Sequence, residues 1–365
     1  MSGAILKISL ANLTHNYNYL RSKIATNVKM LGVVKAVSYG TDSVEVSRHL
    51  EDLGIDYLAV AYSEEGVLLR KKGIRVPILV LHPQPVNFKL LIDNNLEPSL
   101  YSIRVLNLFL DFAKRFEVKN YPVHLKYNSG LNRLGFSDSD IEDVLEKIKC
   151  KEIYIQSIFS HLAASEDLEE KVFTNEQICR FKSFFEKVKN TLSHKPIIHQ
   201  VNTSGILNYP SAHFDMVRTG IGLYGYGNDA RFDKNFKPVA SLTSVISQIH
   251  EISKGESLGY NRGFMAKENT KTATIALGHA DGIGRVYGNK KGFVIINGSK
   301  AFILGNVCMD MLMVDITNID CKEGDEVIVF NNEHSASSLA EAVGTISYEL
   351  ITGIGLRVKR IITDK

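Results

Sequence analysis

A lysine follows a short apolar run near the start of the chain, in Met30-Leu-Gly-Val-Val-Lys35-Ala-Val-Ser-Tyr39-Gly40. The run predicts a buried parallel strand, which places Lys35 at the carboxyl end of that strand. Because an ammonium group is costly to bury, a lysine there needs a partner or a chemical role. One such role is to hold pyridoxal phosphate (PLP) as a Schiff base, with the Tyr39 hydroxyl donating to the cofactor phosphate. The alternative is a lysine that points into solvent, and this stretch alone does not separate the two.

Three further basic residues, Lys126, His161 and Arg218, each lie at or near the carboxyl end of another apolar run. In a barrel of parallel strands these ends share one face, and the active site lies on that face. Each residue by itself is compatible with a structural role, and for a lone histidine that is the better interpretation. Together with Lys35 the three favour a site.

Loops after three of the runs carry groups that bind anions. Arg133 lies in a glycine-flanked loop, where a guanidinium can bind a carboxylate or a phenolic oxygen in fixed geometry. Thr203 can donate its hydroxyl to a phosphate, and the amides of Gly220 and Ile221 can approach one closely. The loops after the seventh and eighth strands are the usual phosphate site of such barrels. The alternatives are a surface arginine and glycines that only mark tight turns.

These residues would be positioned by eight apolar runs with helical segments between them. A helix is expected over residues 12–23, and the fold class is α/β, an eight-stranded α/β (TIM-like) barrel. Besides the lysine strand, the runs are residues 57–61, 77–81, 97–100, 124–127, 157–161, 197–201 and 216–220.

After Pro238 the pattern changes to strands joined by turns, and Asn297-Gly298 between two of them is a strong hairpin signal. A short helix is expected over residues 337–343. We therefore expect residues 1–235 to form a PLP-binding barrel and residues 236–365 a mostly β C-terminal domain.

The composition excludes several other classes. With 365 residues and a formal charge of +3, nucleic-acid and membrane partners are not expected. Neither a spanning apolar run nor a signal peptide is present in the sequence. The four cysteines have no metal-like spacing, so we expect no metal, reduced thiols and a cytoplasmic protein.

The order and spacing of several motifs resemble the bacterial alanine racemase family over almost the whole chain. They are VKAxxYG at residues 34–40, HLKxxxGxxRLGF at 124–136, SHxA at 160–163, VRxGIxLYG at 217–225, GESLGY at 255–260, HADG at 279–282 and CMD at 308–310. The resemblance implies PLP as cofactor, alanine as substrate, a supply of D-alanine for peptidoglycan, and a homodimer with shared active sites.

The resemblance also assigns roles. Lys35 would be the Schiff-base lysine and Tyr260, from the partner subunit, the second base. Lys126 matches a lysine that is carbamylated in many members and braces Arg133. The cofactor phosphate would be bound by Tyr39, Thr203, Gly220, Ile221 and Tyr348, and the pyridine nitrogen would face Arg218. Arg133 would contact the cofactor and the substrate carboxylate, and the backbone amide of Met309 would also bind that carboxylate. His161 would lie behind Tyr260 and Arg218.

Racemisation requires proton exchange on both faces of a planar carbon, which two opposed bases supply. Lysine and tyrosine have unperturbed pKa values of about 10, so both must be lowered, and a nearby arginine favours the tyrosinate. Arg218 keeps its proton, so the nitrogen that it faces stays unprotonated, which suppresses transamination.

Five positions depart from the commonest family pattern, namely Asn128, Thr203, Thr219, His279 and Asn306, and Thr203 keeps the hydroxyl of the usual serine. His279 stands where a tyrosine often lines the substrate entrance, so a broader racemase acting on serine, lysine or ornithine is the main alternative. A PLP decarboxylase of related fold is disfavoured by GESLGY and CMD. A non-catalytic PLP carrier is disfavoured by the C-terminal β domain.

Overall fold

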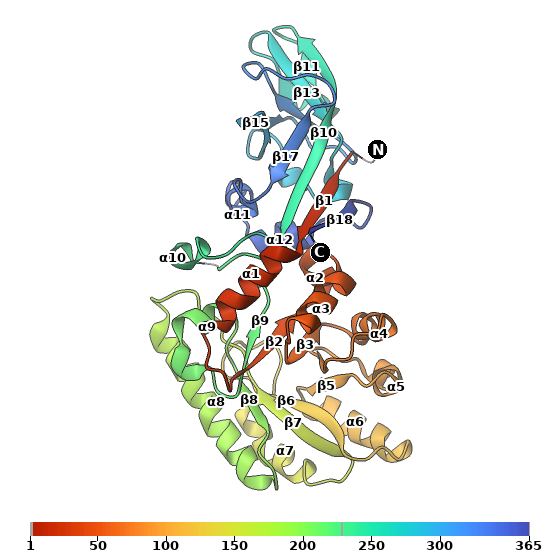
Figure 1. Ribbon diagram of the computed structural model, residues 1–365, viewed down its shortest axis with the longest axis vertical. Helices are drawn as coiled ribbons and strands as arrows, with labels where there is room; N and C mark the ends of the chain where they lie inside the picture. Colours follow the sequence, from red (N-terminus) through yellow and green to blue (C-terminus); the bar gives the residue numbers. More distant parts are fainter. Residues whose placement is uncertain (1–2, 228, 365) are drawn as a thin grey trace. The chain divides into compact units, whose positions relative to one another are not determined.

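The computed structural model describes residues 3–227 and 229–364 (Figure 1). Its contacts divide the chain into two compact units. The barrel unit comprises residues 14–38 and 43–236, and the β unit comprises residues 1–13, 39–42 and 237–365. The N-terminal segment clusters with the β unit because its strand pairs there. The division at residues 235 and 236 stays a prediction.

The barrel unit contains a row of eight strands in which every neighbouring pair is parallel. The row runs β8-β7-β6-β5-β4-β3-β2-β9. Its two ends are joined by backbone hydrogen bonds from Asp215 N to Ile198 O (3.0 Å) and from Arg218 N to Val201 O (3.1 Å). The predicted eight-stranded barrel is confirmed. The strands are β2 Lys29–Val33, β3 Tyr57–Val60, β4 Ile78–Val80, β5 Glu97–Leu100, β6 Tyr121–Lys126, β7 Ile153–Phe159, β8 Ile197–His199 and β9 Met216–Thr219.

Several strands end one or two residues earlier than the apolar runs suggest. Lys35 begins α2, two residues after β2, and His161 lies two residues beyond β7. These side chains therefore sit in the loops at the carboxyl ends of the strands, which is where a barrel places its reacting groups.

The helices of the barrel unit are amphipathic and cover the strands. In α6, the Ser102 side chain accepts a hydrogen bond from Val105 N at the helix start, and an apolar stripe that includes Phe109 is buried. The helices are α1 Leu10–Arg21, α2 Lys35–Gly40, α3 Ser43–Asp52, α4 Ser63–Lys71, α5 Phe88–Asp93, α6 Ile103–Arg115, α7 Ile141–Lys147, α8 Lys171–Thr191, α9 Thr203–Asn208 and α10 Ala230–Asp233. None of the helices described is both long enough and apolar enough to span a bilayer.

The β unit is built on a second eight-stranded sheet, in the order β13-β16-β15-β14-β17-β10-β1-β18. The predicted mostly β character of this part is confirmed. Strand β1 lies between β10, to which it is antiparallel, and β18, to which it is parallel, so the two ends of the chain are tied into one sheet. The strands are β1 Ile5–Ser9, β10 Ala240–Ile252, β13 Thr270–Ile275, β14 Phe293–Ile296, β15 Ser299–Leu304, β16 Leu312–Asp315, β17 Glu326–Phe330 and β18 Lys359–Asp364, with a separate pair β11 Ser257–Leu258 and β12 Phe264–Met265.

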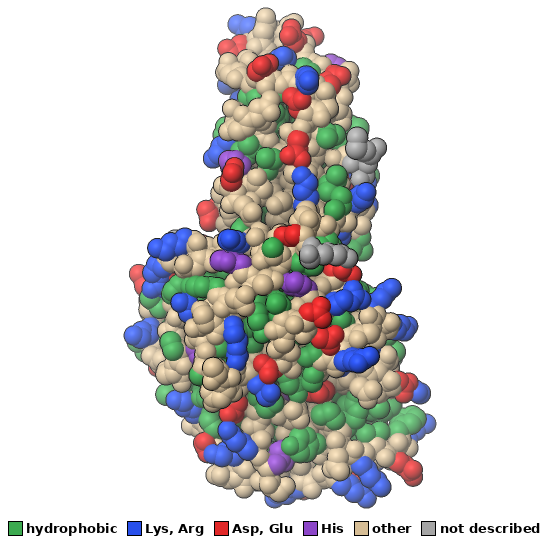
Figure 2. Space-filling model, viewed as in Figure 1, with side chains coloured by type: hydrophobic (Ala, Val, Ile, Leu, Met, Phe, Trp, Pro, Cys, Tyr) green, Lys and Arg blue, Asp and Glu red, His purple; other side chains and the backbone are tan. Residues whose placement is uncertain are grey.

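The predicted hairpin joins β14 to β15, with Ile296 paired to Ser299. Asn297 and Gly298 both have positive φ, 47° and 77°, as a type I′ turn requires. Two short helices follow, α11 Ala336–Glu341 and α12 Ser347–Thr352. Acidic and basic side chains are interspersed over the visible surface (Figure 2), in keeping with the small net charge.

Candidate active site

Lys35 is the first residue of a single turn with unusual handedness. Ala36, Val37, Ser38 and Tyr39 have φ values between 50° and 55°, in the left-handed region that costs non-glycine residues roughly 1–2 kcal/mol each. Gly40 follows with φ 82°, and a Cβ built there would lie 2.0 Å from the Ile351 carbonyl oxygen. Glycine is therefore required where the turn ends.

Glu65, on α4, secures the beginning of this turn. Its Oε1 accepts from Ala36 N (2.7 Å) and its Oε2 from Ala61 N (2.7 Å) and Tyr62 N (3.2 Å). Burial and the neighbouring Arg133 lower the pKa of Lys35, while the Glu65 carboxylate opposes this shift. Lys35 is thus more readily a neutral amine than a lysine in water.

Lys126 ends β6 and is buried, with 6% of its surface exposed. Burial, followed by the charges of Arg133, Arg218 and Lys35, lowers its pKa to about 8. Its Nζ lies 5.8 Å from the centroid of the Phe159 ring. The four cationic side chains of Lys35, Lys126, Arg133 and Arg218 therefore share one neighbourhood.

Arg218, on β9, is the most heavily hydrogen-bonded of these groups. Its Nη1 donates to His199 Nδ1 (2.7 Å), and its Nη2 donates to Ser160 O (2.6 Å), Gln200 O (2.8 Å) and His161 Nδ1 (3.0 Å). Burial lowers the pKa of Arg218 to about 9, so the group stays charged at neutral pH. The guanidinium is fixed in orientation by four acceptors.

Both histidines at Arg218 are held neutral. Burial is the main cause that lowers the pKa of His161 and His199 well below the usual range, and Arg218 adds to it. The His199 ring stacks on Phe159 with centroids 5.0 Å apart. Since each accepts from Arg218 at Nδ1, each carries its proton on Nε2.

The loops after β8 and β9 approach one another closely. Gly222 N donates to Thr203 Oγ1 (3.3 Å), and a Cβ added at Gly222 would lie 2.6 Å from Thr203 Cγ2. Thr219, one of the departures from the family pattern, places its Oγ1 3.2 Å from Thr203 Oγ1. Within the described residues, the amides of Gly220 and Ile221 have no acceptor in the protein. Two unused N–H groups beside a buried hydroxyl suit an anionic ligand.

In the β unit, Tyr39 packs beside Tyr348 of α12, with ring centroids 6.0 Å apart. Burial raises the pKa of Tyr39, and Tyr348 adds to the shift. The Tyr39 side chain therefore remains a phenol, which can donate a hydrogen bond.

Tyr260 lies on a turn whose backbone is also left-handed, at Gly259, Asn261 and Arg262. Its side chain is 74% exposed in this unit. Asn306 Nδ2 donates to the Tyr260 carbonyl oxygen (3.2 Å), so this departure from the family pattern supports the turn that carries the tyrosine.

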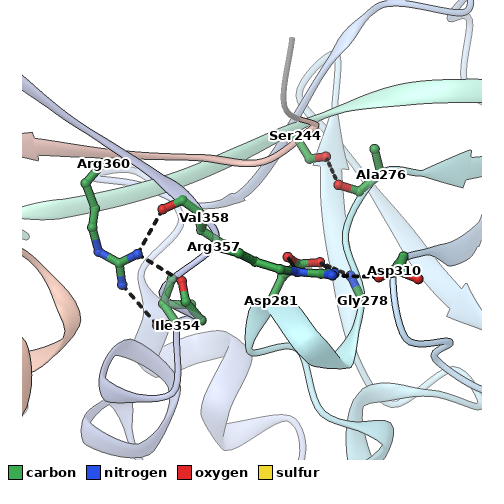
Figure 3. Close-up of polar contacts among 10 residues, drawn as sticks. Ser244, Ala276, Gly278, Asp281, Asp310, Ile354, Arg357, Val358 and Arg360 are labelled. Carbon is green, nitrogen blue, oxygen red and sulfur yellow. Dashed lines mark hydrogen bonds and ion pairs between the residues drawn. The ribbon is translucent and has the colours of Figure 1, made fainter.

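The loops that carry His279 and Met309 are joined by one arginine (Figure 3). Arg357 donates to both Asp281 oxygens (2.7 and 3.0 Å) and pairs with Asp310 Oδ1 (2.7 Å). The backbones also meet, through His279 N to Cys308 O (2.9 Å) and Ala280 N to Met309 O (3.0 Å). Met309 is 58% exposed, and within the described residues its amide has no acceptor.

Known protein families match the chain over almost its whole length. A family profile described as "Alanine racemase, N-terminal domain" matches residues 8–228, and one described as "Alanine racemase, C-terminal domain" matches residues 239–362. The chain belongs to the alanine racemase family. The alanine racemase of Thermodesulfovibrio yellowstonii is 36% identical over 364 residues, which cover 97% of this chain and 96% of that relative.

Solved alanine racemases share the fold. The structure from Clostridium difficile 630 is 32% identical, with a TM-score of 0.92 and coverage of 100% of this chain and 97% of that one. The structure from Bartonella henselae, which carries covalently bound pyridoxal phosphate, is 27% identical, with a TM-score of 0.90 and full coverage of both chains. The family resemblance expected from the motifs is confirmed.

Three residues of the site and its surroundings were not identified from the sequence. His199 lies beside Gln200 in an otherwise apolar run, and its polarity there was its only signal. Glu65 and Arg357 have no signal in the sequence, because their partners are brought to them only by the fold. The structure gathers Lys35, Lys126, Arg133, His161 and Arg218 in the barrel unit and places Tyr260, Met309 and Tyr348 in the β unit.

Proposed function

We propose that this chain interconverts L-alanine and D-alanine with PLP, with Lys35 and Tyr260 as the two bases. The observation that carries the proposal is the cluster of cationic groups around Lys35, whose own pKa is lowered. The relatives described above are named alanine racemases, which favours alanine over the broader range of substrates considered as the alternative.

The residues present suit PLP. Two unused amides at Gly220 and Ile221, with the Thr203 hydroxyl, would bind the phosphate, and Tyr39 and Tyr348 would add phenolic donors. Among the described residues, the acceptors around Arg218 leave Nε and one Nη1 hydrogen unused, and one of these would donate to the ring nitrogen. When bound, the cofactor conjugates negative charge at the substrate Cα with its ring.

The chain's own groups then have separate tasks. A neutral Lys35 can accept a proton at Nζ, and its lowered pKa makes that form accessible near neutrality. Arg133 would bind the substrate carboxylate, together with the Met309 amide. Arg218 keeps its proton, so the atom that it faces must accept a hydrogen bond. His161, neutral with its proton on Nε2, would support the phenol of Tyr260.

A homodimer is part of the proposal. Tyr260 and Met309 are exposed in the β unit, although both are assigned to a site that also needs Lys35. We infer that each subunit offers these two residues to its partner's barrel. We also infer a cytoplasmic location and a supply of D-alanine for peptidoglycan, which the free thiols of all four cysteines permit.

Lys126 is proposed to carry a carbamate. The neutral amine would attack CO2, forming an N–C bond and releasing a proton, and the new negative charge would lie among three cations. Because the pKa of Lys126 is lowered to about 8, the neutral fraction grows as pH rises through that value. Protein incubated with ¹³C-labelled bicarbonate should show a carbamate ¹³C resonance that increases from pH 7 to 9 and is missing in Lys126→Ala. A resonance that persists in Lys126→Ala would refute the assignment.

Lys35 is expected to bind the cofactor covalently, because it is a partly buried lysine with an accessible neutral form. PLP-loaded protein should be yellow, racemise L-alanine by circular dichroism, and lose its visible band on reduction with borohydride. Lys35→Ala should lose the band and at least a thousandfold of the activity, on the order expected for a group required for reaction. The matched control Lys29→Ala, at the other end of β2, should keep both. Mapping the reduced adduct to another lysine would contradict the assignment.

Shared sites are tested by mixing two inactive chains, Lys35→Ala and Tyr260→Phe. A mixed dimer contains one site with both defects and one with neither. Free exchange of equal amounts should therefore restore about a quarter of the wild-type activity, since half of the dimers are mixed and one of their two sites is intact. Subunit exchange is confirmed by native mass spectrometry. Full exchange without recovered activity would argue against the shared site.

Tyr260 is expected to be the base that acts on L-alanine, and Lys35 the base that acts on D-alanine. In deuterated water, Tyr260→Phe should keep the cofactor and exchange the α-proton of D-alanine with retention. It should leave L-alanine nearly unlabelled, because one face has no base. Tyr62→Phe, which removes another exposed phenol, is the control. Equal exchange from both enantiomers would refute the role of Tyr260 but not the family assignment.

A further inference from the structure

A continuous line of hydrogen bonds crosses the barrel interior from Arg218 to a carboxylate. Arg218 Nη1 meets His199 Nδ1 (2.7 Å), and His199 Nε2 meets Ser157 Oγ (2.9 Å). Ser157 Oγ meets His124 Nδ1 (2.5 Å), and His124 Nε2 meets Glu97 Oε2 (2.8 Å). Five adjacent strands of the row, β9, β8, β7, β6 and β5, each contribute one residue. We call this line the barrel relay.

The chemistry of its two ends fixes the direction of every hydrogen bond. Arginine has only donors, so His199 must accept at Nδ1 and carry its proton on Nε2. That proton is donated to Ser157, whose hydroxyl hydrogen is then directed to His124 Nδ1. His124 therefore carries its proton on Nε2 and donates it to Glu97, an acceptor when ionised. With both histidines neutral, this is the one arrangement of protons that satisfies all four contacts.

Burial makes it energetically costly to depart from this arrangement of protons. His124, Ser157 and His199 have no exposed surface, so an unmet donor or acceptor there would cost its full desolvation. The Glu97 side chain is 13% exposed and also accepts from the Tyr57 hydroxyl (3.3 Å), which in turn accepts from Gln156 Nε2 (2.9 Å). The relay thus begins at a buried cation and ends at a carboxylate that water can reach.

We propose that Ser157, His124 and Glu97 are positioning residues for Arg218, acting through His199. They fix the His199 tautomer, and this tautomer presents the lone pair that holds the Nη1 end of the guanidinium. The relay conducts no proton, because Arg218 does not release one. The relay would influence the proposed reaction by orienting Arg218. It would also orient His161, which accepts a hydrogen bond from Arg218 Nη2.

Ser157→Ala is the central variant because it breaks the relay in the middle. His199 Nε2 then loses its acceptor, and moving the proton to Nδ1 would set it against the Arg218 donor. Ser99→Ala is a matched control. Ser99 is the register partner of His124 on the neighbouring strand, is equally buried, and its hydroxyl has no partner among the described residues. Ser157→Thr restores the hydroxyl.

The first measurement is independent of activity. Histidine ring nitrogens of the ¹⁵N-labelled full-length chain are observed by long-range ¹H–¹⁵N correlation, and His199 is assigned by its absence in His199→Asn. We expect the Nε2–H tautomer at His199 and His124 in the wild type. The His199 signals should shift in Ser157→Ala and return toward wild type in Ser157→Thr. The His199 signals should also shift in Glu97→Leu, although residue 97 does not contact His199. They should keep their wild-type positions in Glu97→Gln, because glutamine retains an acceptor oxygen.

The second measurement is steady-state racemisation with PLP and alanine. We expect kcat to fall about tenfold in Ser157→Ala, with KM changed far less, since one buried donor is left unmet. Ser99→Ala should match the wild type. An Nδ1–H tautomer at His199 in the wild type, or equal NMR and kinetic effects of Ser157→Ala and Ser99→Ala, would overturn the proposal. If the wild type does not racemise alanine, the proposed function fails while the tautomers still test the relay.

Discussion

A buried guanidinium can only donate hydrogen bonds, and much of the barrel interior follows from this constraint. Arg218 needs acceptors on every side, and the strand ends supply two carbonyls and two imidazole nitrogens. Each imidazole that accepts is thereby committed to one tautomer and to the neutral form. The same cation raises the cost of protonating His161 and His199, so hydrogen bonding and electrostatics act in the same direction. Arg218 therefore adds to burial in keeping both neighbouring imidazoles neutral.

The barrel site carries more positive charge than its own residues balance. Lys35, Lys126, Arg133 and Arg218 influence one another as like charges, and Glu65 is the carboxylate that acts on Lys35. Like charges in a site of lowered dielectric repel strongly and displace pKa values, as they do for Lys126. An anionic phosphate, a substrate carboxylate or a carbamate would each relieve the repulsion. Burial is the first cause of the lowered amine pKa values, the surplus of charge adds to it, and the same surplus favours an anionic ligand.

The sequence predicted those parts of the structure that local pattern determines. Apolar runs marked the barrel strands, strand ends marked Lys126 and Arg218, and Asn297-Gly298 marked its hairpin. It did not predict the pairing of β1 with β10 and β18, because that contact joins the two ends of the chain. The ion pairs of Arg357 with two distant aspartates and the relay beyond His199 were not predicted either, because neither follows from a local sequence pattern. The roles proposed for Tyr260 and Met309 came from the family motifs, because no local pattern marks them.

The turn after Lys35 was also beyond sequence reasoning, because Ala36 and Val37 have no preference for the left-handed region. Four such residues cost about 4–8 kcal/mol together, which is comparable to the net stability of a whole domain. Strain of that size persists only where the surroundings over-determine the backbone. Here Glu65 holds the Ala36 amide, Arg360 donates to the carbonyls of Gly40 and Thr41, and Gly40 fits against Ile351 where a Cβ would not. The contacts at both ends of the turn, rather than any local preference of its residues, therefore determine its backbone.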